Sequence, residues 1–591
     1  MPIKSADQSI VLTAIARLDN REELCRELGL DQAVWSLTPD STLVFEAHRR
    51  WGENSPSHLF GDWSYAAWDP KERCLFLARD QLGNTSLFYA FRPPLVAFAS
   101  HHSALTVLNE IPTELDEEWL FSSFTFVSLP NDRTPWRGIR TVLSGHCVSF
   151  AGCGEKSRCY WDLRSVPVRR LPRDEDYLEG FLEHFRSAVD SRLRSVGPIG
   201  STLSAGLDSG TVTALAAEKL AEYNDTLDTF TSVPLFPSAS RHRLSDEWPL
   251  ARIVVDRYPN IIPSLIRAEN ASPVAALRRV LEWIGQPVYA AANMFWIDAL
   301  FSEARLRGIK VLLTGQLGNG GVSWDGGVNR MLCLFLNGNF TSGFTELKRW
   351  SGYRGVSLAR AIAVSLIRPI MNIGRQFWLS RLNQMTPPPL LNADFARRHM
   401  HLFEENKIFV INPSRARYLS LFRNGVYTGL LWHCFGTVNG MEVRDPTADV
   451  RLLEFCLGVP EAQDVHNGGD RMLLRRATIG ILPDAVRLNR VRGGQAADIA
   501  LRLVRAQAEV EDTLTVMSTT PSVTNYIDIH RLRHLWAEIR SNPQSAHTGS
   551  ACSRLMRFLS AGFFLISSQW LSGNQSWVEG GKRQRSVDLY L

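Results

Sequence analysis

The stretch Ile199–Gly210, which reads I-G-S-T-L-S-A-G-L-D-S-G, decides the fold of this 591-residue chain. Its first five residues, Ile199 to Leu203, form a short apolar run that is typical of a buried strand. Small residues follow, and Gly210–Tyr223 then has the pattern of a helix. A strand, a small-residue turn and a helix N-terminus together present backbone N–H groups and the positive end of a helix dipole. The stretch therefore predicts a binding site for a phosphate or a similar anion.

The side chains of this turn suit a phosphate and its metal ion. Ser204 and Ser209 can donate hydrogen bonds, and Asp208 can hold a divalent cation that bridges phosphates. The turn lacks the Gly-Lys-Ser/Thr ending of a Walker motif, so it belongs to another class of phosphate loop. An ordinary strand–turn–helix connection is the simpler alternative, and the rest of the chain decides between the two.

Length and composition indicate a globular protein of at least two domains. A chain of 591 residues is too long for one hydrophobic core. Hydrophobic residues make up 45% and charged residues 21%, as in ordinary soluble domains. The net charge of +5 is small and does not favour a nucleic-acid partner. The nine cysteines include no C-x-x-C pair, so we expect free thiols in a reducing cytoplasm, without zinc or a disulfide framework.

No segment has the features of a membrane span or a signal peptide. The polar stretch Met1–Ser9 lacks an apolar signal core. Val356–Ser380 is apolar but contains three arginines, and Phe558–Leu571 is shorter than the roughly 20 residues of a span. We therefore expect buried helices in both stretches and no transmembrane segment, although association of a larger assembly with a membrane stays open.

Residues 1–165 have the pattern of a β-rich domain. We expect short strands, separated by Gly, Pro, Asn and Asp turns, at Leu43–Ala47, Ser64–Trp68, Cys74–Arg79, Leu87–Phe91, Leu95–Ser100 and His146–Ser149. Phe60–Asp69, followed by Arg79–Gly83 and Leu87-Phe88-Tyr89, resembles the glutamine-amidotransferase-like (Ntn-type) domain of asparagine synthetases. Members that hydrolyse glutamine carry Cys at position 2, where this chain has Pro2. The resemblance thus implies a degenerate domain without glutaminase activity, retained as a scaffold or docking surface.

Residues 174–591 form the second expected domain. We expect helices at Tyr177–Leu193, Glu247–Arg257, Val274–Trp283 and Phe295–Arg307, strands at Thr229–Val233, Ile261–Ile266 and Ile309–Leu313, and mostly helices beyond residue 330. This alternation predicts an α/β fold, a doubly wound parallel sheet with helical extensions. The ligand should lie at the carboxyl ends of the strands, where the second glycine-rich loop, Thr314–Gly321, also begins.

The order of motifs resembles the asparagine-synthetase superfamily. Its pyrophosphate loop reads S-G-G-x-D-S, with Ala205 here at one glycine; Gly440–Asp449 resembles its G-x-E-x-R-x-P-F-x-D segment, and Asn489–Arg492 its N-R-x-K segment. The resemblance implies a C-terminal ATP-pyrophosphatase domain that uses ATP and Mg²⁺. It implies nucleotide-binding roles for Ser204, Ala205, Gly206, Leu207, Asp208, Ser209, Val233, Thr314, Gly315 and Asn319, with Asp208 also as the metal ligand.

The same resemblance implies two catalytic residues. Glu442 matches a glutamate that assists amine deprotonation in β-lactam-forming relatives, although an ion pair with Arg444 is the structural alternative. Arg492 stands where those relatives place a lysine that stabilises developing charge, and Arg490 is its competitor. Gln316 and Asn319 replace acidic residues of the second loop, which weakens the expected metal site.

Three further segments resemble lasso peptide cyclases: Gly321–Gly327, Asp246–Pro249 and Arg492–Asp498. They imply that Ser323 and Trp324 contact a peptide. The implied reaction is adenylation of an Asp or Glu side chain of a ribosomal precursor peptide, then attack by the peptide's N-terminal amine to form an isopeptide bond. The implied partners are the precursor peptide, a leader-binding protein and a leader protease. An ammonia- or small-amine-using synthetase and an inactive nucleotide- or peptide-binding scaffold stay as alternatives.

Overall fold

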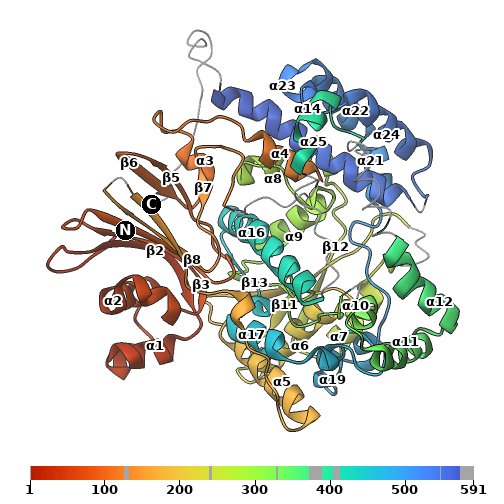
Figure 1. Ribbon diagram of the computed structural model, residues 1–591, viewed down its shortest axis with the longest axis horizontal. Helices are drawn as coiled ribbons and strands as arrows, with labels where there is room; N and C mark the ends of the chain where they lie inside the picture. The colour runs from red at the N-terminus through yellow and green to blue at the C-terminus, as the bar shows by residue number, and fades with distance from the viewer. Residues whose placement is uncertain are drawn as a thin grey trace.

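The computed structural model describes residues 2–572 except 126–131, 153, 238–242, 328–329, 372–373, 375–388, 403–412 and 546. A β-rich part formed by the first 160 residues packs beside a larger α/β part (Figure 1). This arrangement confirms the predicted α/β fold class.

The N-terminal part has two antiparallel sheets packed face to face. One has six strands in the order β1-β2-β3-β4-β8-β9 and the other has the order β6-β5-β7. Tyr89 and Phe150 make an edge contact between the sheets, with ring centroids 5.4 Å apart. The strands are β1 (Ile3–Lys4), β2 (Val11–Leu18), β3 (Gly61–Asp69), β4 (Cys74–Arg79), β5 (Phe88–Arg92), β6 (Leu95–Ala99), β7 (Arg140–Thr141), β8 (His146–Ala151) and β9 (Gly154–Cys159).

The strand expected at Leu43–Ala47 is wrong. These residues form the centre of helix α2 (Asp40–Trp51), which with α1 (Arg21–Leu28) covers the outer face of the six-stranded sheet. Leu43, Val44 and Ala47 are fully buried there. A short apolar run gives no period that separates a strand from a buried helix, so the prediction failed at this point.

The C-terminal part contains a five-stranded, fully parallel sheet in the order β12-β11-β10-β13-β14. The strands are β10 (Ile199–Thr202), β11 (Leu227–Ser232), β12 (Ile261–Ile266), β13 (Val311–Leu313) and β14 (Glu442–Arg444). Leu312 faces one hydrophobic core while Val311 and Leu313 face another, as the two-residue repeat of a strand requires. Both faces are therefore covered, which is the doubly wound arrangement that the alternation of elements predicts.

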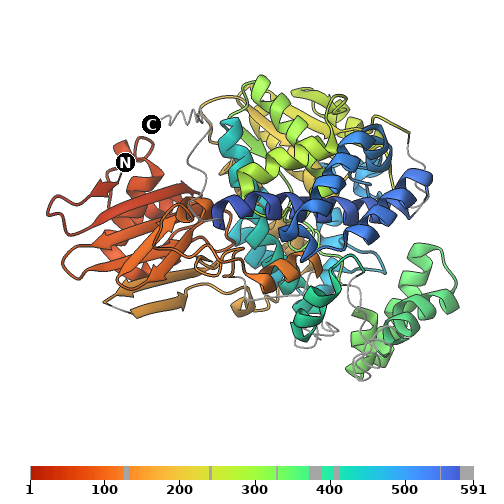
Figure 2. The same cartoon turned by 90° about the horizontal axis from the view of Figure 1, so that it is seen from above.

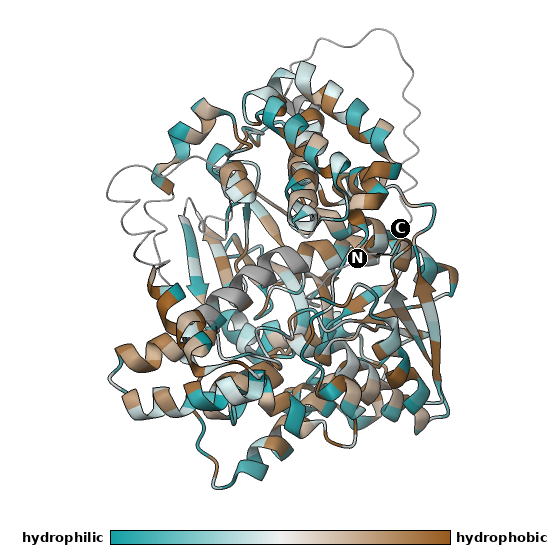
Figure 3. Ribbon diagram, turned by 90° about the vertical axis from the view of Figure 1, so that its right-hand side faces the viewer, coloured by the Kyte–Doolittle hydropathy of each residue, from teal (hydrophilic) through white to brown (hydrophobic). Residues whose placement is uncertain are grey.

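Helices cover both faces of this sheet. One face carries α5 (Asp174–Asp190), α6 (Leu207–Ala221), α7 (Trp248–Arg257), α17 (Val450–Gly458) and α19 (Met472–Ala477), and the other carries α8 (Pro273–Ile284), α9 (Met294–Leu306), α16 (Pro413–Asn439) and α25 (Thr548–Ser572). Most helices show both apolar and polar residues along their length (Figure 3), as helices with one face in a core do. The remaining helices are α3 (His102–Leu105), α4 (Glu117–Thr125), α10 (Arg330–Leu336), α11 (Phe340–Arg354), α12 (Leu358–Ile362), α14 (Ala393–His399), α18 (Glu461–Asp464), α20 (Asp484–Arg487), α21 (Ile499–Arg505), α22 (Gln507–Thr519), α23 (Pro521–Thr524) and α24 (Ile529–Ser541).

Local sequence signals explain where α8 begins and ends. The Ser272 hydroxyl accepts the N–H of Ala275, and Pro273 is the first helical residue. Gly285 ends the helix in the left-handed conformation, with φ of 69°. These signals lie within one predicted segment, which is why the prediction Val274–Trp283 agrees closely with the structure.

The two apolar stretches behave differently. Phe558–Leu571 lies in α25, where Phe558, Leu559 and Phe564 are buried, as expected. The described part of Val356–Ser380 contains α12 and a π-helix, η5 (Ala363–Ile367), and the exposed fractions of Val364 and Ile370 are 42% and 54%. The expected burial of this stretch is therefore wrong for its described residues, because these helices project from the rest of the chain (Figure 2). No helix among the described residues is long and apolar enough to cross a membrane.

A buried cluster of charges joins the two parts of the chain. Arg192, just after α5, donates to Asp449 at the start of α17 over 2.9 Å and lies 3.2 Å from Asp19 of the N-terminal part. The three side chains are 1–3% exposed. Burial alone would raise the pKa of Asp449, but Arg192 and Arg451 outweigh it and hold that pKa well below its usual range.

We predict that Arg192→Met destabilises the protein by about 3–5 kcal/mol, because it removes the fully buried cation that Asp449 and Asp19 share and leaves them with Arg451 and Arg17 alone. Arg451→Met is the matched control. Arg451 also pairs with Asp449 but is 30% exposed, so its loss should cost about 1 kcal/mol or less. Urea unfolding of both variants measures the difference, and equal losses would show that Arg192 has no special role at the interface.

Candidate functional site

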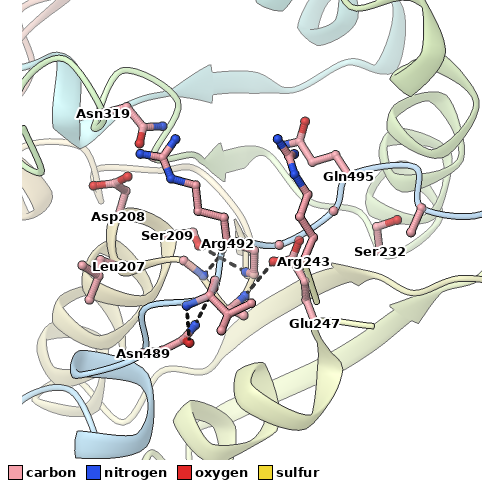
Figure 4. Close-up of a pocket in the computed structure, with 18 of the residues that line it drawn as sticks. Leu207, Asp208, Ser209, Ser232, Arg243, Glu247, Asn319, Asn489, Arg492 and Gln495 are labelled. Atoms are coloured by element: carbon pink, nitrogen blue, oxygen red, sulfur yellow. Dashed lines mark hydrogen bonds between the residues drawn. The ribbon is translucent and has the colours of Figure 1, made fainter. Parts of the chain in front are cut away.

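A cavity of about 1070 Å³ opens at the carboxyl ends of β10, β11 and β13 (Figure 4). It is lined by the loop after β10, the loop after β13 and the segment 489–498. Among the described residues, eight arginines and five carboxylates line it, and this positive excess suits an anionic ligand. The cavity lies at the sheet edge where doubly wound folds bind ligands.

The loop between β10 and α6 is held together by its own serines. The hydroxyls of Ser204 and Ser209 lie 2.7 Å apart, and the N–H of Ser204 donates to Ser209 Oγ over 3.1 Å. The N–H of Gly206 donates to Ser204 Oγ over 3.1 Å. Helix α6 begins at Leu207, three residues earlier than predicted, so Asp208 and Ser209 lie in its first turn. The first turn of a helix presents N–H groups without helical partners, which an anion can accept from.

Asp208 is suited to bind a cation in this loop. Its side chain is buried, and Oδ1 has no hydrogen-bond partner among the described residues. Burial raises the pKa of Asp208, while the Ser323 hydroxyl and the guanidiniums of Arg471 and Arg492 act against that rise. Mg²⁺ is commonly held by one or two carboxylates together with substrate phosphates and water. The orphaned oxygen therefore fits a magnesium ion held by a single protein carboxylate.

The loop after β13 lies directly against Asp208. A Cβ on Gly318 would overlap the Asp208 carboxylate, and a Cβ on Gly315 would lie 2.9 Å from the backbone nitrogen of Ser209. Only glycine allows this approach of the two loops. The loop between β10 and α6, residues 204–209, is called the serine loop below. Thr314, Gly315 and Asn319 consequently line the same cavity as the serine loop, as the resemblance implies.

Asn319 has an arginine as its partner. Arg471 donates from Nη2 to Asn319 Oδ1 over 2.8 Å, and both residues line the cavity. Gln316 also lines the cavity but carries no charge. No group of three or more His, Cys, Asp or Glu side chains in the described part of the chain is arranged to hold a metal. The loop thus presents the amides of Gln316 and Asn319, and Arg471 from the start of α19 binds the Asn319 oxygen.

The two arginines that the sequence proposes both reach the cavity. Arg492 lies 3.1 Å from Asp325, and in Figure 4 its side chain extends toward Asn319, on the side of the cavity where Asp208 lies. Arg490 stacks on the ring of Tyr353, 3.8 Å from its centroid. Both arginines therefore have partners in this structure, and Arg492 is the one whose charge lowers the pKa of Asp208 in the loop after β10.

The structure does not bring Glu442 to the cavity. Glu442 pairs with Val311 at the amino end of the parallel strands, whereas the cavity lies at their carboxyl ends. Its side chain is 62% exposed and lies 2.6 Å from Arg444. The geometry therefore supports the ion pair with Arg444 and gives no support to the expected catalytic role of Glu442.

Ser323 and Trp324 are buried side chains that do not line the cavity. Ser323 is 1% exposed and Trp324 is 7% exposed, with the Arg417 guanidinium 5.6 Å from the Trp324 ring. Neither residue lines the cavity. The expected peptide contact is therefore not supported for these two side chains, although their neighbour Asp325 does line it. Val233, at the end of β11, lines the cavity as the resemblance implies.

Sequence reasoning missed three residues of this site. Glu247 accepts the N–H of Ala205 over 2.9 Å, and Arg471 binds Asn319. Asp498 accepts the N–H of Leu235 over 2.7 Å. Glu247 and Asp498 lie in segments whose resemblance to lasso peptide cyclases was evident, but no spacing links them to the serine loop. Their partners are distant in the chain, so only the fold reveals the contacts.

Comparison with protein families and relatives agrees with this geometry. The asparagine synthase family model matches residues 180–572, and the glutamine amidotransferase domain model matches residues 1–161. The chain is 24% identical over 487 residues to glutamine-hydrolyzing asparagine synthetase 3 of Bacillus subtilis, covering 79% of this chain and 72% of that protein. It is also 24% identical over 499 residues to asparagine synthetase 2 of the same organism, covering 80% and 61%.

The fold of the solved glutamine phosphoribosylpyrophosphate amidotransferase of B. subtilis aligns with a TM-score of only 0.21 at 11% identity, covering 46% of this chain and 73% of that one. The family match spans most of the chain and includes the serine loop, the glycine loop after β13 and the segment 489–498. The chain therefore belongs to the asparagine synthase family, whose members are ATP-dependent, AMP-forming ligases that make carbon–nitrogen bonds.

Proposed function

We propose that this chain closes a ring in a ribosomal precursor peptide by forming an isopeptide bond, as lasso peptide cyclases do. One observation carries the proposal: a single cavity, lined by eight arginines of the described residues, combines the two loops with an aromatic wall that includes Trp296, Phe301 and Trp432. At about 1070 Å³, it slightly exceeds the roughly 300–1,000 Å³ of a typical small-molecule pocket. A nucleotide and an apolar peptide segment suit such a two-sided cavity.

In the first step, the serine loop would hold the phosphates of ATP. Loop N–H groups and the hydroxyls of Ser204 and Ser209 donate to phosphate oxygens, and Arg471 and Arg492 neutralise charge. Asp208 would hold Mg²⁺, which neutralises phosphate charge when bound. A carboxylate oxygen of the peptide's Asp or Glu then attacks the α-phosphorus. The bond to the β-phosphate breaks, pyrophosphate leaves, and an acyl-adenylate forms.

In the second step, the N-terminal amine of the peptide attacks the acyl carbon. The carbon–oxygen bond to AMP breaks, AMP leaves, and the amine loses a proton. Holding both ends of the peptide in one cavity makes this attack effectively unimolecular, which is worth up to about 7–11 kcal/mol in favourable cases. The partners that we propose are the precursor peptide, a leader-binding protein and a leader protease, acting in the cytoplasm.

An asparagine- or β-lactam-type synthetase is the second candidate. The names of the B. subtilis relatives favour it. We propose that Pro2 prevents the glutamine-dependent form, so free ammonia or a small amine would be the nucleophile. An inactive scaffold is the third candidate, and the retained serine loop with the orphaned Asp208 oxygen speaks against it.

Pyrophosphate release with defined substrates separates these functions. We expect release and a product lighter by one water with a precursor peptide that has a free N-terminus and one acidic acceptor. The matched peptide with Asn or Gln at the acceptor should be inert. Release with aspartate and ammonia, but not with the peptide, would establish the second candidate, and release with neither would establish the scaffold.

We predict that Asp208→Asn lowers pyrophosphate release at least about 100-fold, because the amide cannot replace a carboxylate that binds a cation. The buried site tolerates the isosteric amide, so the thermal unfolding midpoint should stay close to that of the unchanged protein. Steady-state pyrophosphate release together with a melting curve checks both parts. Turnover close to normal would remove Asp208 from the mechanism.

We also predict that Arg471→Ala weakens ATP binding about tenfold or more, since it removes a charged donor from the phosphate side of the cavity. Arg471→Lys should retain part of the affinity because it keeps the charge. Asn319→Asp should also weaken binding, because its carboxylate would pair with Arg471 and compete with phosphate for that guanidinium. Calorimetric titration with a non-hydrolysable ATP analogue measures all three, and equal affinities throughout would contradict the role of Arg471.

A further inference from the structure

The Glu247 carboxylate lies against the serine loop and is hydrogen-bonded to its backbone. Glu247 is the residue just before α7, and its Oε2 accepts the N–H of Ala205 over 2.9 Å. Ala205 belongs to the same turn as Ser204 and Ser209, the turn that binds phosphate in the proposed function. Figure 4 shows the Glu247 side chain rising from its helix toward this turn. A negatively charged protein group thus accepts one of the N–H donors that an anionic ligand would use.

The chain is built to hold Glu247 in this position. A Cβ on Gly493 would overlap the Glu247 carboxylate, so only glycine leaves room for it. The backbone of Leu244 bonds to Arg492 and Gly494 on either side of that glycine, which fixes the two segments together. Burial raises the pKa of Glu247, and the N–H of Ala205 acts against that rise. The carboxylate therefore occupies a fitted space between the loop and the segment 492–494.

Of the other four carboxylates that line the cavity, Asp208 lies against the loop after β13, and three have ion pairs. Asp325 pairs with Arg492, Asp470 with Arg354 and Asp498 with Arg502. Glu247 forms no ion pair among the described residues, and its bond to Ala205 is a charge-assisted hydrogen bond to an anion-binding loop. A phosphate oxygen placed on the same N–H would meet this carboxylate, and two anions close together repel each other.

We propose that Glu247 is an internal anion that occupies a phosphate position of the serine loop and that the pyrophosphate part of ATP displaces it. The proposal rests on the proposed function in that ATP binds this loop. Glu247 keeps the loop in its binding shape and must give up the N–H of Ala205 when phosphate arrives. Because Gly493 packs against the same carboxylate, its departure also empties the space beside the segment that carries Arg492.

Titration of the full-length protein with magnesium pyrophosphate tests this competition. Glu247→Gln removes the charge and weakens the bond to Ala205. Glu247→Asp keeps the charge in the cavity but is one methylene too short to reach that N–H. We expect both variants to bind pyrophosphate about tenfold more tightly than the unchanged protein, since each removes or weakens an internal competitor. The control, Asp256→Asn, changes a carboxylate near the other end of α7, whose side chain is 63% exposed, and should leave affinity unchanged.

The variants distinguish competition from simple repulsion. If Glu247→Gln binds pyrophosphate more tightly while Glu247→Asp binds it as the unchanged protein does, the negative charge alone weakens binding by repulsion. That result would overturn the proposed displacement. Equal or weaker binding by both variants overturns it as well, while binding by the unchanged protein would leave the proposed function intact. If no variant binds pyrophosphate or an ATP analogue, both the displacement and the proposed function fail. Binding by the two Glu247 variants alone would support the displacement most directly.

Discussion

The functional cavity depends on the close approach of two loops at the carboxyl edge of the parallel sheet. The loop after β13 can reach the serine loop only because Gly315 and Gly318 have no side chain where Asp208 and Ser209 lie. This contact buries the Asp208 carboxylate and leaves one of its oxygens without a donor. The parallel pairing of β10 with β13 fixes both loops at the same height, so the sheet register determines the chemistry of the site.

Arginine side chains supply the positive charge of this cavity among the described residues. Where the resemblance leads one to expect carboxylates on the second loop, Gln316 and Asn319 are neutral, and Asn319 is bound by Arg471. An arginine is always charged and forks toward oxygen pairs, so it binds phosphate without a metal ion. Protein cations and a single carboxylate ligand can thus share the neutralisation that a second acidic residue would otherwise assist. Glu247 is the opposite case, a fixed anion among these cations.

The parts of the fold and site that the sequence predicted are those with local signals. The turn Ser204–Ser209, the helix α8 and the glycine loop each carry their own residue types within a few positions. Leu43–Ala47 was misassigned because a short apolar run has no readable period. Glu442 was misplaced for a different reason: a motif names a residue type but not the end of the strand on which it lies. Arg471 and Glu247 act through partners far along the chain, which no local pattern reveals.

The buried charges at the domain interface join the N-terminal domain to the ligase part. Arg192 and Asp449 belong to the ligase part, yet Arg192 also lies against Asp19 of the N-terminal part, and all three are almost inaccessible. Arg194 of the ligase part likewise pairs with Asp40 of α2. Removing the N-terminal domain would expose these groups and take away their partners. Arg444 of β14 donates hydrogen bonds to the carbonyl oxygens of Arg192 and Arg194, and so connects this interface to β14. Since β14 pairs with β13, contacts with the N-terminal domain continue through β14 to the strand that precedes the second glycine-rich loop.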